Sequence, residues 1–146
     1  MGFAEDIAGF AAKTEHKMDL AVRKISLELF SRVILRSPVG NPDLWKKPRP
    51  GYVGGRFRAN WQVAIGSIPD GTLDLNDASG TATISNASAA LAGVSAGEVI
   101  YLINNLDYGP ALEDGHSGQA PAGMVGLSVQ EFQRIAEQVG FELVQI

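Results

Sequence analysis

The stretch that decides the fold is residues 3–36, FAEDIAGFAAKTEHKMDLAVRKISLELFSRVILR. Its apolar side chains recur at spacings of three, four and eight residues, which indicates one apolar face of a helix. These side chains are Phe3, Ile7, Phe10, Met18, Val22, Ile25, Leu29 and Val33. A residue that precedes proline avoids helical backbone angles, so the helix should end before Ser37-Pro38. We therefore predict one long helix over residues 3–36.

This helix would be about 50 Å long at a rise of about 1.5 Å per residue. One small core does not need a helix of that length. We therefore expect part of its apolar face to pack against another subunit.

The segments that follow the helix predict a sheet. Residues 56–66, RFRANWQVAIG, alternate between polar and apolar side chains, which is typical of a half-buried strand. Arg56, Arg58 and Asn60 would lie on its exposed face. Residues 81–84 predict a second strand. Residues 99–103 are apolar throughout and predict a central third strand.

Two shorter helices complete the prediction. Residues 86–94 are rich in alanine and follow residues that cap helices well. A second helix is expected over 128–138, because Ser128 and Glu131 fit a capping box and Gly140 can end the helix. The sequence thus predicts an α+β fold, with a long N-terminal helix packed on a small, mostly antiparallel sheet and one or two further helices. A length of 146 residues favours a single domain over residues 1–146.

The composition excludes several kinds of protein. The chain has no cysteine, which excludes disulfides, thiolate metal sites and cysteine nucleophiles. It has no run of 18 apolar residues, so no membrane span is expected. Glu5 and Asp6 stand where a signal peptide carries basic residues, so export by that route is not expected.

The charges are distributed unevenly along the chain. Residues 1–60 hold 11 of the 12 Lys and Arg and 6 of the 16 Asp and Glu, which leaves +5 for the first part and −9 for the second. If these parts form different faces, identical subunits can pack head to tail around a ring. If the two parts interleave in the fold, the charge asymmetry does not indicate head-to-tail packing.

The glycine-rich segment 100–125 contains the candidate catalytic residues Tyr108, Glu113, Asp114, His116 and Ser117. Residues 115–119, GHSGQ, resemble the serine-hydrolase elbow G-x-S-x-G, but Gln119 replaces the last glycine. An elbow also needs a strand directly before it, whereas the predicted strand ends about ten residues upstream. A small hydrolase that uses residues 113–117 is therefore an alternative of a different class.

Other ligands are also conceivable from the residue types. Glu113, Asp114 and His116 are of the kinds that bind divalent ions, but three ligands within four residues would need help from elsewhere. The proline-rich segment 37–55 combines Trp45 with basic residues, as binders of single-stranded nucleic acid do. We expect neither a metal ion nor another cofactor.

Three motifs resemble, in order and spacing, segments of the HK97 gp10-like family of tailed-phage proteins. Ser37-Pro38-Val39 and residues 55–61, GRFRANW, are similar to its SPVDTGRLRASW pattern, with residues 40–54 inserted and the Asp-Thr pair absent. Residues 100–105, IYLINN, and 108–117, YGPALEDGHS, resemble the family's N…PYA..LE.GHS segment. Residues 119–125, QAPAGMV, resemble its Q.P.GM continuation.

The resemblance implies a neck or tail-completion protein, also described as a minor tail protein, of a tailed-phage virion. Such a protein assembles as a homo-oligomeric ring, expected to be a hexamer, which joins the tail to the head connector around the DNA channel. It implies no enzymatic activity and no cofactor. A tail terminator, the ring that caps the tail tube, is a close alternative.

The expected partners are other copies of the chain and the neighbouring neck, connector and tail proteins. Genomic DNA would pass through the lumen without sequence-specific binding, and no membrane is involved. The expected location is the virion, after assembly in the cytoplasm of the bacterial host. The residues expected at assembly contacts are Trp45, Arg56, Arg58, Asn60, Tyr108, Glu113, Asp114, His116, Ser117 and Gln119.

Overall fold

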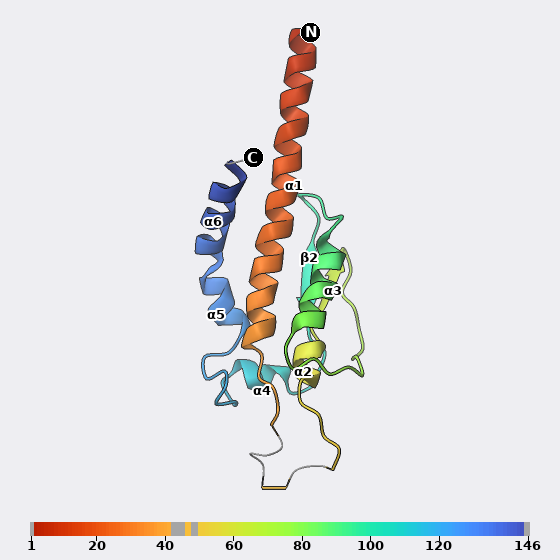
Figure 1. The fold of residues 1–146 in the computed structure, drawn as a ribbon, viewed down its shortest axis with the longest axis vertical. Helices are drawn as coiled ribbons and strands as arrows, with labels where there is room; N and C mark the ends of the chain where they lie inside the picture. Colours follow the sequence, from red (N-terminus) through yellow and green to blue (C-terminus); the bar gives the residue numbers. More distant parts are fainter. Residues whose placement is uncertain (1, 42–45, 48–49, 145–146) are drawn as a thin grey trace.

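One long helix forms the axis of the molecule, and the other elements pack along part of its length (Figure 1). The structure is a computed structural model that describes residues 2–41, 46–47 and 50–144. The elements are α1 (Phe3–Arg36), α2 (Arg56–Ala59), β1 (Gln62–Ile65), α3 (Thr81–Leu91), β2 (Ile100–Ile103), α4 (Gly109–Glu113), α5 (Val125–Gln130) and α6 (Phe132–Val144). The predicted α+β fold is confirmed.

Helix α1 has the predicted bounds. It ends at Ser37, whose backbone is extended, as expected of a residue before proline. The Ser37 hydroxyl donates to Val33 O at 2.8 Å and its N–H donates to Ile34 O at 3.1 Å. Both bonds satisfy carbonyls at the helix end that lack partners within the helix.

The second half of α1 lies between two layers. Helix α6 packs on one side through Ile135, Val139 and Leu143. Helix α3 and the sheet pack on the other side, where Phe30 joins Leu91 in the core. Figure 1 shows α5 and α6 running back along α1, with α3 and β2 on the opposite side of α1.

The sheet is smaller than predicted. Within residues 50–144 it has two antiparallel strands, β1 and β2, with Val63 opposite Leu102. A sheet of two strands has no central strand, so the prediction that 99–103 is central is wrong. The residues of both strands are half-buried. The apolar side chains of β2 reflect packing against α1 and α3 on one face.

The prediction of a strand over 56–66 is wrong for its first part. Residues 56–59 form α2, which begins after Gly55 with its positive φ of 103°. A Cβ on Gly55 would lie 2.5 Å from the backbone nitrogen of Ala78, so only glycine fits this position. Asn60, predicted on an exposed strand face, is 0% exposed. Its amide donates to Arg56 O and Leu73 O, and its oxygen accepts the Leu73 N–H.

The prediction of a strand over 81–84 is also wrong, because these residues begin α3. The carboxylate of Asp77 accepts the Thr83 N–H at 2.8 Å and the Thr83 hydroxyl at 2.7 Å. Burial opposes ionisation of Asp77, but these bonds and one from Ser79 outweigh it and lower its pKa. This anchor starts the helix despite the strand propensity of the threonines.

The last helices begin earlier and end later than predicted. Ser128 is not a cap but a buried residue inside α5, where its hydroxyl donates to Met124 O and accepts from Arg36. Gly140 lies within α6, which continues to Val144. Residues 141–144 thus form the last turn of this helix, and residues 145–146 lie outside the described residues.

The oppositely charged parts of the chain interleave rather than forming separate faces. Arg32 and Arg36 of α1 both bind Glu131, the former at 2.9 Å. Lys24 of α1 lies 3.8 Å from Glu142 of α6. Some basic residues of the first part of the chain therefore form ion pairs with acidic residues of the second part in the same copy.

The first half of α1 extends beyond the other elements (Figure 1). Phe3 is 81% exposed and Phe10 71% exposed, although both belong to the predicted apolar face. No helix in the described part of the chain is long and apolar enough to cross a membrane.

We predict that Asn60→Ala lowers the free energy of unfolding by about 2–3 kcal/mol, because it leaves three part-buried backbone groups without their side-chain partner. Chemical denaturation would measure this. The control is Gln62→Ala, which removes one exposed bond to Gly71 O and should cost less than about 0.5 kcal/mol. Equal losses in both variants would contradict the structural role of Asn60.

We predict that the stability contribution of Glu131 depends on pH. Hydrogen bonding to Arg36, together with the charges of Arg36 and Arg32, lowers its pKa from 4.5 despite some desolvation. Its contribution is therefore fully present above pH 4.5 and is lost as the pH falls through the lowered pKa. Glu131→Gln should destabilise the protein at pH 7, and the difference from wild type should shrink in acid.

Thermal unfolding from pH 7 to pH 3 would follow this difference. Glu137→Gln removes the same charge from the exposed face of α6 and serves as the matched control. A constant difference between wild type and Glu131→Gln at every pH would contradict the prediction.

Candidate functional site

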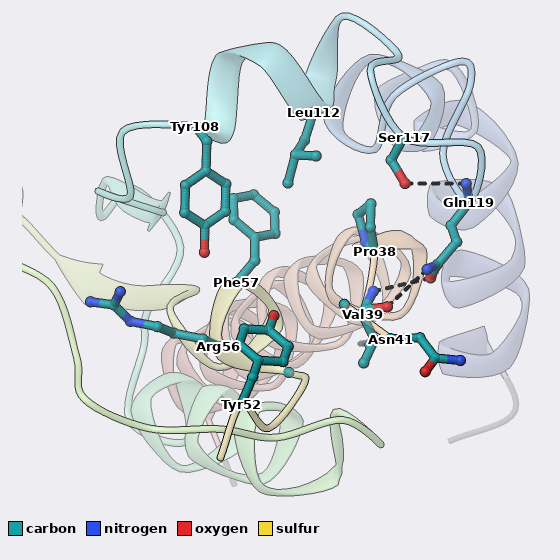
Figure 2. A pocket seen from close by; sticks show the side chains of 12 residues that line it. Pro38, Val39, Asn41, Tyr52, Arg56, Phe57, Tyr108, Leu112, Ser117 and Gln119 are labelled. Atoms are coloured by element: carbon teal, nitrogen blue, oxygen red, sulfur yellow. Dashed lines mark hydrogen bonds between the residues drawn. The ribbon is translucent and has the colours of Figure 1, made fainter. Parts of the chain in front are cut away.

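An open pocket of about 540 Å³ lies at the C-terminal end of α1, where three distant segments meet. Its walls come from the turn after α1, from the start of α2 and from α4 with the loop that follows (Figure 2). The lining residues are Pro38, Val39, Gly40, Asn41, Tyr52, Gly55, Arg56, Phe57, Tyr108, Leu112, Ser117 and Gln119. We call this cavity the junction pocket.

A hydrogen-bond network behind the junction pocket joins α1 to α2. The Ser37 hydroxyl accepts the indole N–H of Trp61 at 2.7 Å. The Arg58 guanidinium donates to Leu35 O at 2.9 Å, to Ser37 O at 2.7 Å and to Ala78 O at 2.6 Å. Arg58 therefore does not lie on an exposed strand face, as predicted, but binds carbonyls at the end of α1.

The charge of Arg58 is balanced by its surroundings. Burial lowers the pKa of Arg58, and the nearby carboxylate of Asp77 opposes that shift. Because Asp77 also anchors the start of α3, the two side chains connect α1, α2 and α3.

The opposite wall is held by Gln119. Its side-chain oxygen accepts the Val39 N–H at 3.0 Å, and its side-chain amide donates to Val39 O at 2.8 Å. Its own N–H donates to the Ser117 hydroxyl at 3.2 Å, and Figure 2 shows these bonds side by side. This pairing fixes the loop after α4 against the turn after α1.

Aromatic rings extend from the junction pocket into the core. Tyr108 packs on Phe57 with ring centroids 5.7 Å apart, and Phe57 meets Trp61 edge to face at the same separation. Tyr108 remains 44% exposed. Burial raises the pKa of its hydroxyl, while the positive charge of Arg56 opposes the shift. The pocket therefore presents aromatic surface backed by a rigid stack.

Glu113 has a structural partner that the sequence did not indicate. Its carboxylate accepts the N–H groups of Met124, Val125 and Gly126, the closest at 2.8 Å. It thus caps the N-terminus of α5 with a negative charge, which is favourable there. Gly123 makes this approach possible, since a Cβ at that residue would lie 2.4 Å from Glu113 O.

The serine-hydrolase arrangement is not assembled. Ser117 lines the junction pocket, whereas the adjacent His116 is exposed and outside the lining. His16 lies on the exposed first half of α1, about 30 Å along the helix from its end. A serine nucleophile needs its base within hydrogen-bond reach.

The metal site is also not formed by the described residues. These residues contain no group of three or more His, Cys, Asp and Glu that could hold a metal ion. Asp114 is exposed at the end of α4. Lys46 and Lys47 are exposed, but Trp45, the expected aromatic partner, lies outside the described residues.

The predicted site residues therefore separate into four groups. Arg56, Tyr108, Ser117 and Gln119 line one pocket. Arg58, Asn60 and Glu113 hold the fold, Asp114 and His116 lie on the exposed loop, and Trp45 is not described.

Sequence reasoning missed the structural roles of two residues behind the junction pocket, Ser37 and Asp77. Ser37 was recognised as a helix end and as part of a motif, but not as the hydrogen-bond partner of Trp61. The Asp77-Ala78-Ser79-Gly80 segment does carry a signal, because Asp and Ser before a glycine often begin a helix.

Comparison with known protein families, curated proteins and solved structures finds no match to this chain.

We predict that Glu113→Ala lowers the free energy of unfolding by about 2 kcal/mol, because three N–H groups at the start of α5 lose a charged acceptor. Asp114→Ala is the matched control, since it removes the same charge from the next residue, which is exposed. The control should change stability by less than about 0.5 kcal/mol. Chemical denaturation of both variants would test the cap, and equal stability in the two would contradict it.

Proposed function

We propose that this chain is a neck or tail-completion protein of a tailed phage. In the virion it forms a homo-oligomeric ring of six copies that joins the tail to the head connector around the DNA channel. One observation carries the proposal: the three motifs that resemble the phage family converge on the junction pocket. Side chains or backbone from 38–39, 55–57 and 108–119 contribute to its walls, although up to 80 residues separate bonded partners.

The chemistry of the junction pocket favours docking of a protein segment over catalysis. Its polar side chains Ser117 and Gln119 are occupied by structural hydrogen bonds. The exposed parts are aromatic rings and the guanidinium of Arg56, and tyrosine and arginine are enriched at protein interfaces. The rings are held by packing, so binding orders few side chains.

A closed ring requires two different surfaces on each copy. The junction pocket is one of them. The outer side of α6 offers another, because Phe141 is 70% exposed and Val144 is 77% exposed. These surfaces belong to different ends of the molecule (Figure 1), which suits head-to-tail contacts.

The proposed partners are other copies of the chain and the adjoining neck, connector and tail proteins. A net charge of −4 suits a channel that DNA must traverse, because few phosphate contacts would hold it. Assembly would take place in the host cytoplasm and place the protein in the virion.

We predict that phage lacking this protein produces heads and tails of normal length that do not join. Electron microscopy of lysates would show this. Tails of uncontrolled length would instead assign the protein to the tail terminator. Normal joined particles would contradict both functions.

We predict that Tyr108→Ala fails to restore joining in such a lysate, with at least about a tenfold loss of complete particles, because the pocket loses its exposed anchor ring. Asp107→Ala changes the neighbouring exposed residue and should restore joining. Thermal unfolding must show both variants folded. Full rescue by Tyr108→Ala would contradict docking at the junction pocket.

A further inference from the structure

The first turns of α1 carry an apolar stripe that the rest of the molecule leaves uncovered. Phe3 is 81% exposed, Ile7 53% and Phe10 71%. At about 100° per residue, these three side chains and Thr14 lie within a narrow band on one side of the helix. We call these four residues the N-terminal stripe. It continues the face through which α1 binds α6, beyond the point where α6 ends (Figure 1).

The two flanks of the N-terminal stripe differ in chemistry. Asp6 and Lys13, of opposite charge, lie along one flank. Ala4 and Ala11 lie along the other and permit close approach of a second helix. A partner must therefore present an apolar stripe with a charged flank on the matching side.

A second copy of the same segment in antiparallel orientation meets this requirement. A two-fold axis between two helices brings like flanks together, so Asp6 of each copy faces Lys13 of the other. The alanine flanks meet in the same way. In the core of the pair, Ile7 of one copy lies against Phe10 of the other, and Phe3 lies against Thr14.

A parallel pair would not use these charges, because its charged flank would face the alanine flank. A lipid surface is also a poor partner, since Asp6 beside the stripe is repelled by anionic headgroups. The charge pattern thus favours an antiparallel second copy over a parallel copy or a lipid surface.

We propose that residues 3–14 of α1 pair in antiparallel fashion with the same residues of a second copy, forming a two-fold dimer of the free protein. An isologous contact closes at two copies. About three turns of helix bury less than the about 800 Å² per partner of a standard interface, so the dimer is reversible. The inference rests on the N-terminal stripe alone and does not depend on the proposed function.

Charge reversal tests the orientation. Sedimentation velocity from about 1 to about 100 µM should show a concentration-dependent dimer of the wild type. Asp6→Lys alone and Lys13→Asp alone should each weaken it about tenfold, because two attractive pairs become two repulsions. The double variant Asp6→Lys/Lys13→Asp restores both pairs and should recover an affinity close to that of the wild type.

Two variants complete the sedimentation experiment. Glu5→Lys makes the same charge change on the opposite face of α1 and should leave the dimer unchanged. Phe10→Ser should leave a folded monomer, because Phe10 is exposed within one copy. A monomeric wild type, a double variant as weak as the single variants, or vesicle binding that depends on Phe10 would overturn the proposal.

Cross-linking gives an independent test, because the chain has no native cysteine. An equimolar mixture of Ala4→Cys and Ala11→Cys should form oxidised heterodimers readily. Each variant alone should cross-link poorly, since like positions lie about 10 Å apart along an antiparallel pair. Cross-linking of Ala4→Cys with itself as efficient as in the mixture would overturn the proposal, because the antiparallel pair holds these two positions apart. Failure here would leave the phage-neck function standing, and loss of that function would leave the dimer standing.

Discussion

The rest of the structure depends on the hydrogen bonds at Ser37, where α1 ends. The Ser37 hydroxyl donates to Val33 O and accepts from Trp61, and its carbonyl accepts from Arg58. The last carbonyls of a helix have no partner within it, and a buried end must find partners elsewhere. Here Arg58 of α2 donates to the carbonyls of Leu35 and Ser37, and Trp61, two residues after α2, donates to the Ser37 hydroxyl. Satisfying the end of α1 therefore also fixes the first wall of the junction pocket. The orientation of Phe57, and through it of Tyr108, follows from that junction.

The sequence predicted α1 because its periodicity extends over 34 residues and stops at a proline. The same approach failed for 56–66, where strict alternation predicted a strand. A short helix forms there instead, which begins after Gly55 with its positive φ and ends at Asn60 with its buried amide. The alternation of polar and apolar side chains carries no information about either feature. It failed for 81–84 because Asp77, four residues before Thr81, supplies the acceptors that start α3. In both regions a specific polar contact outweighed a local propensity.

For the candidate site, the sequence identified residues but not their partners. Glu113 and Gln119 were selected as polar side chains of the segment 100–125, in which Glu113 ends α4 and Gln119 lies in the loop that follows. Their partners Met124 and Val39 lie 11 and 80 residues away, and both partner groups belong to the backbone. Backbone acceptors and donors carry no sequence signal, because every residue has them. A polar loop residue that caps a helix or bridges two segments therefore looks the same in sequence as one that binds a ligand.

Two of the surfaces for which we propose partners, the junction pocket and the N-terminal stripe, lie at opposite ends of α1. Phe3 and Arg36 are separated by about 50 Å of helix, so a segment bound in the junction pocket does not compete with a copy bound on the N-terminal stripe. The first half of α1 is held by no layer of the core, and its helix can depend only on its own hydrogen bonds and on a partner. The second half is fixed between α6 and α3. Contact at the N-terminal stripe should therefore stabilise the first half of α1 without changing the junction pocket. The binding free energies at the two ends should then be independent of each other.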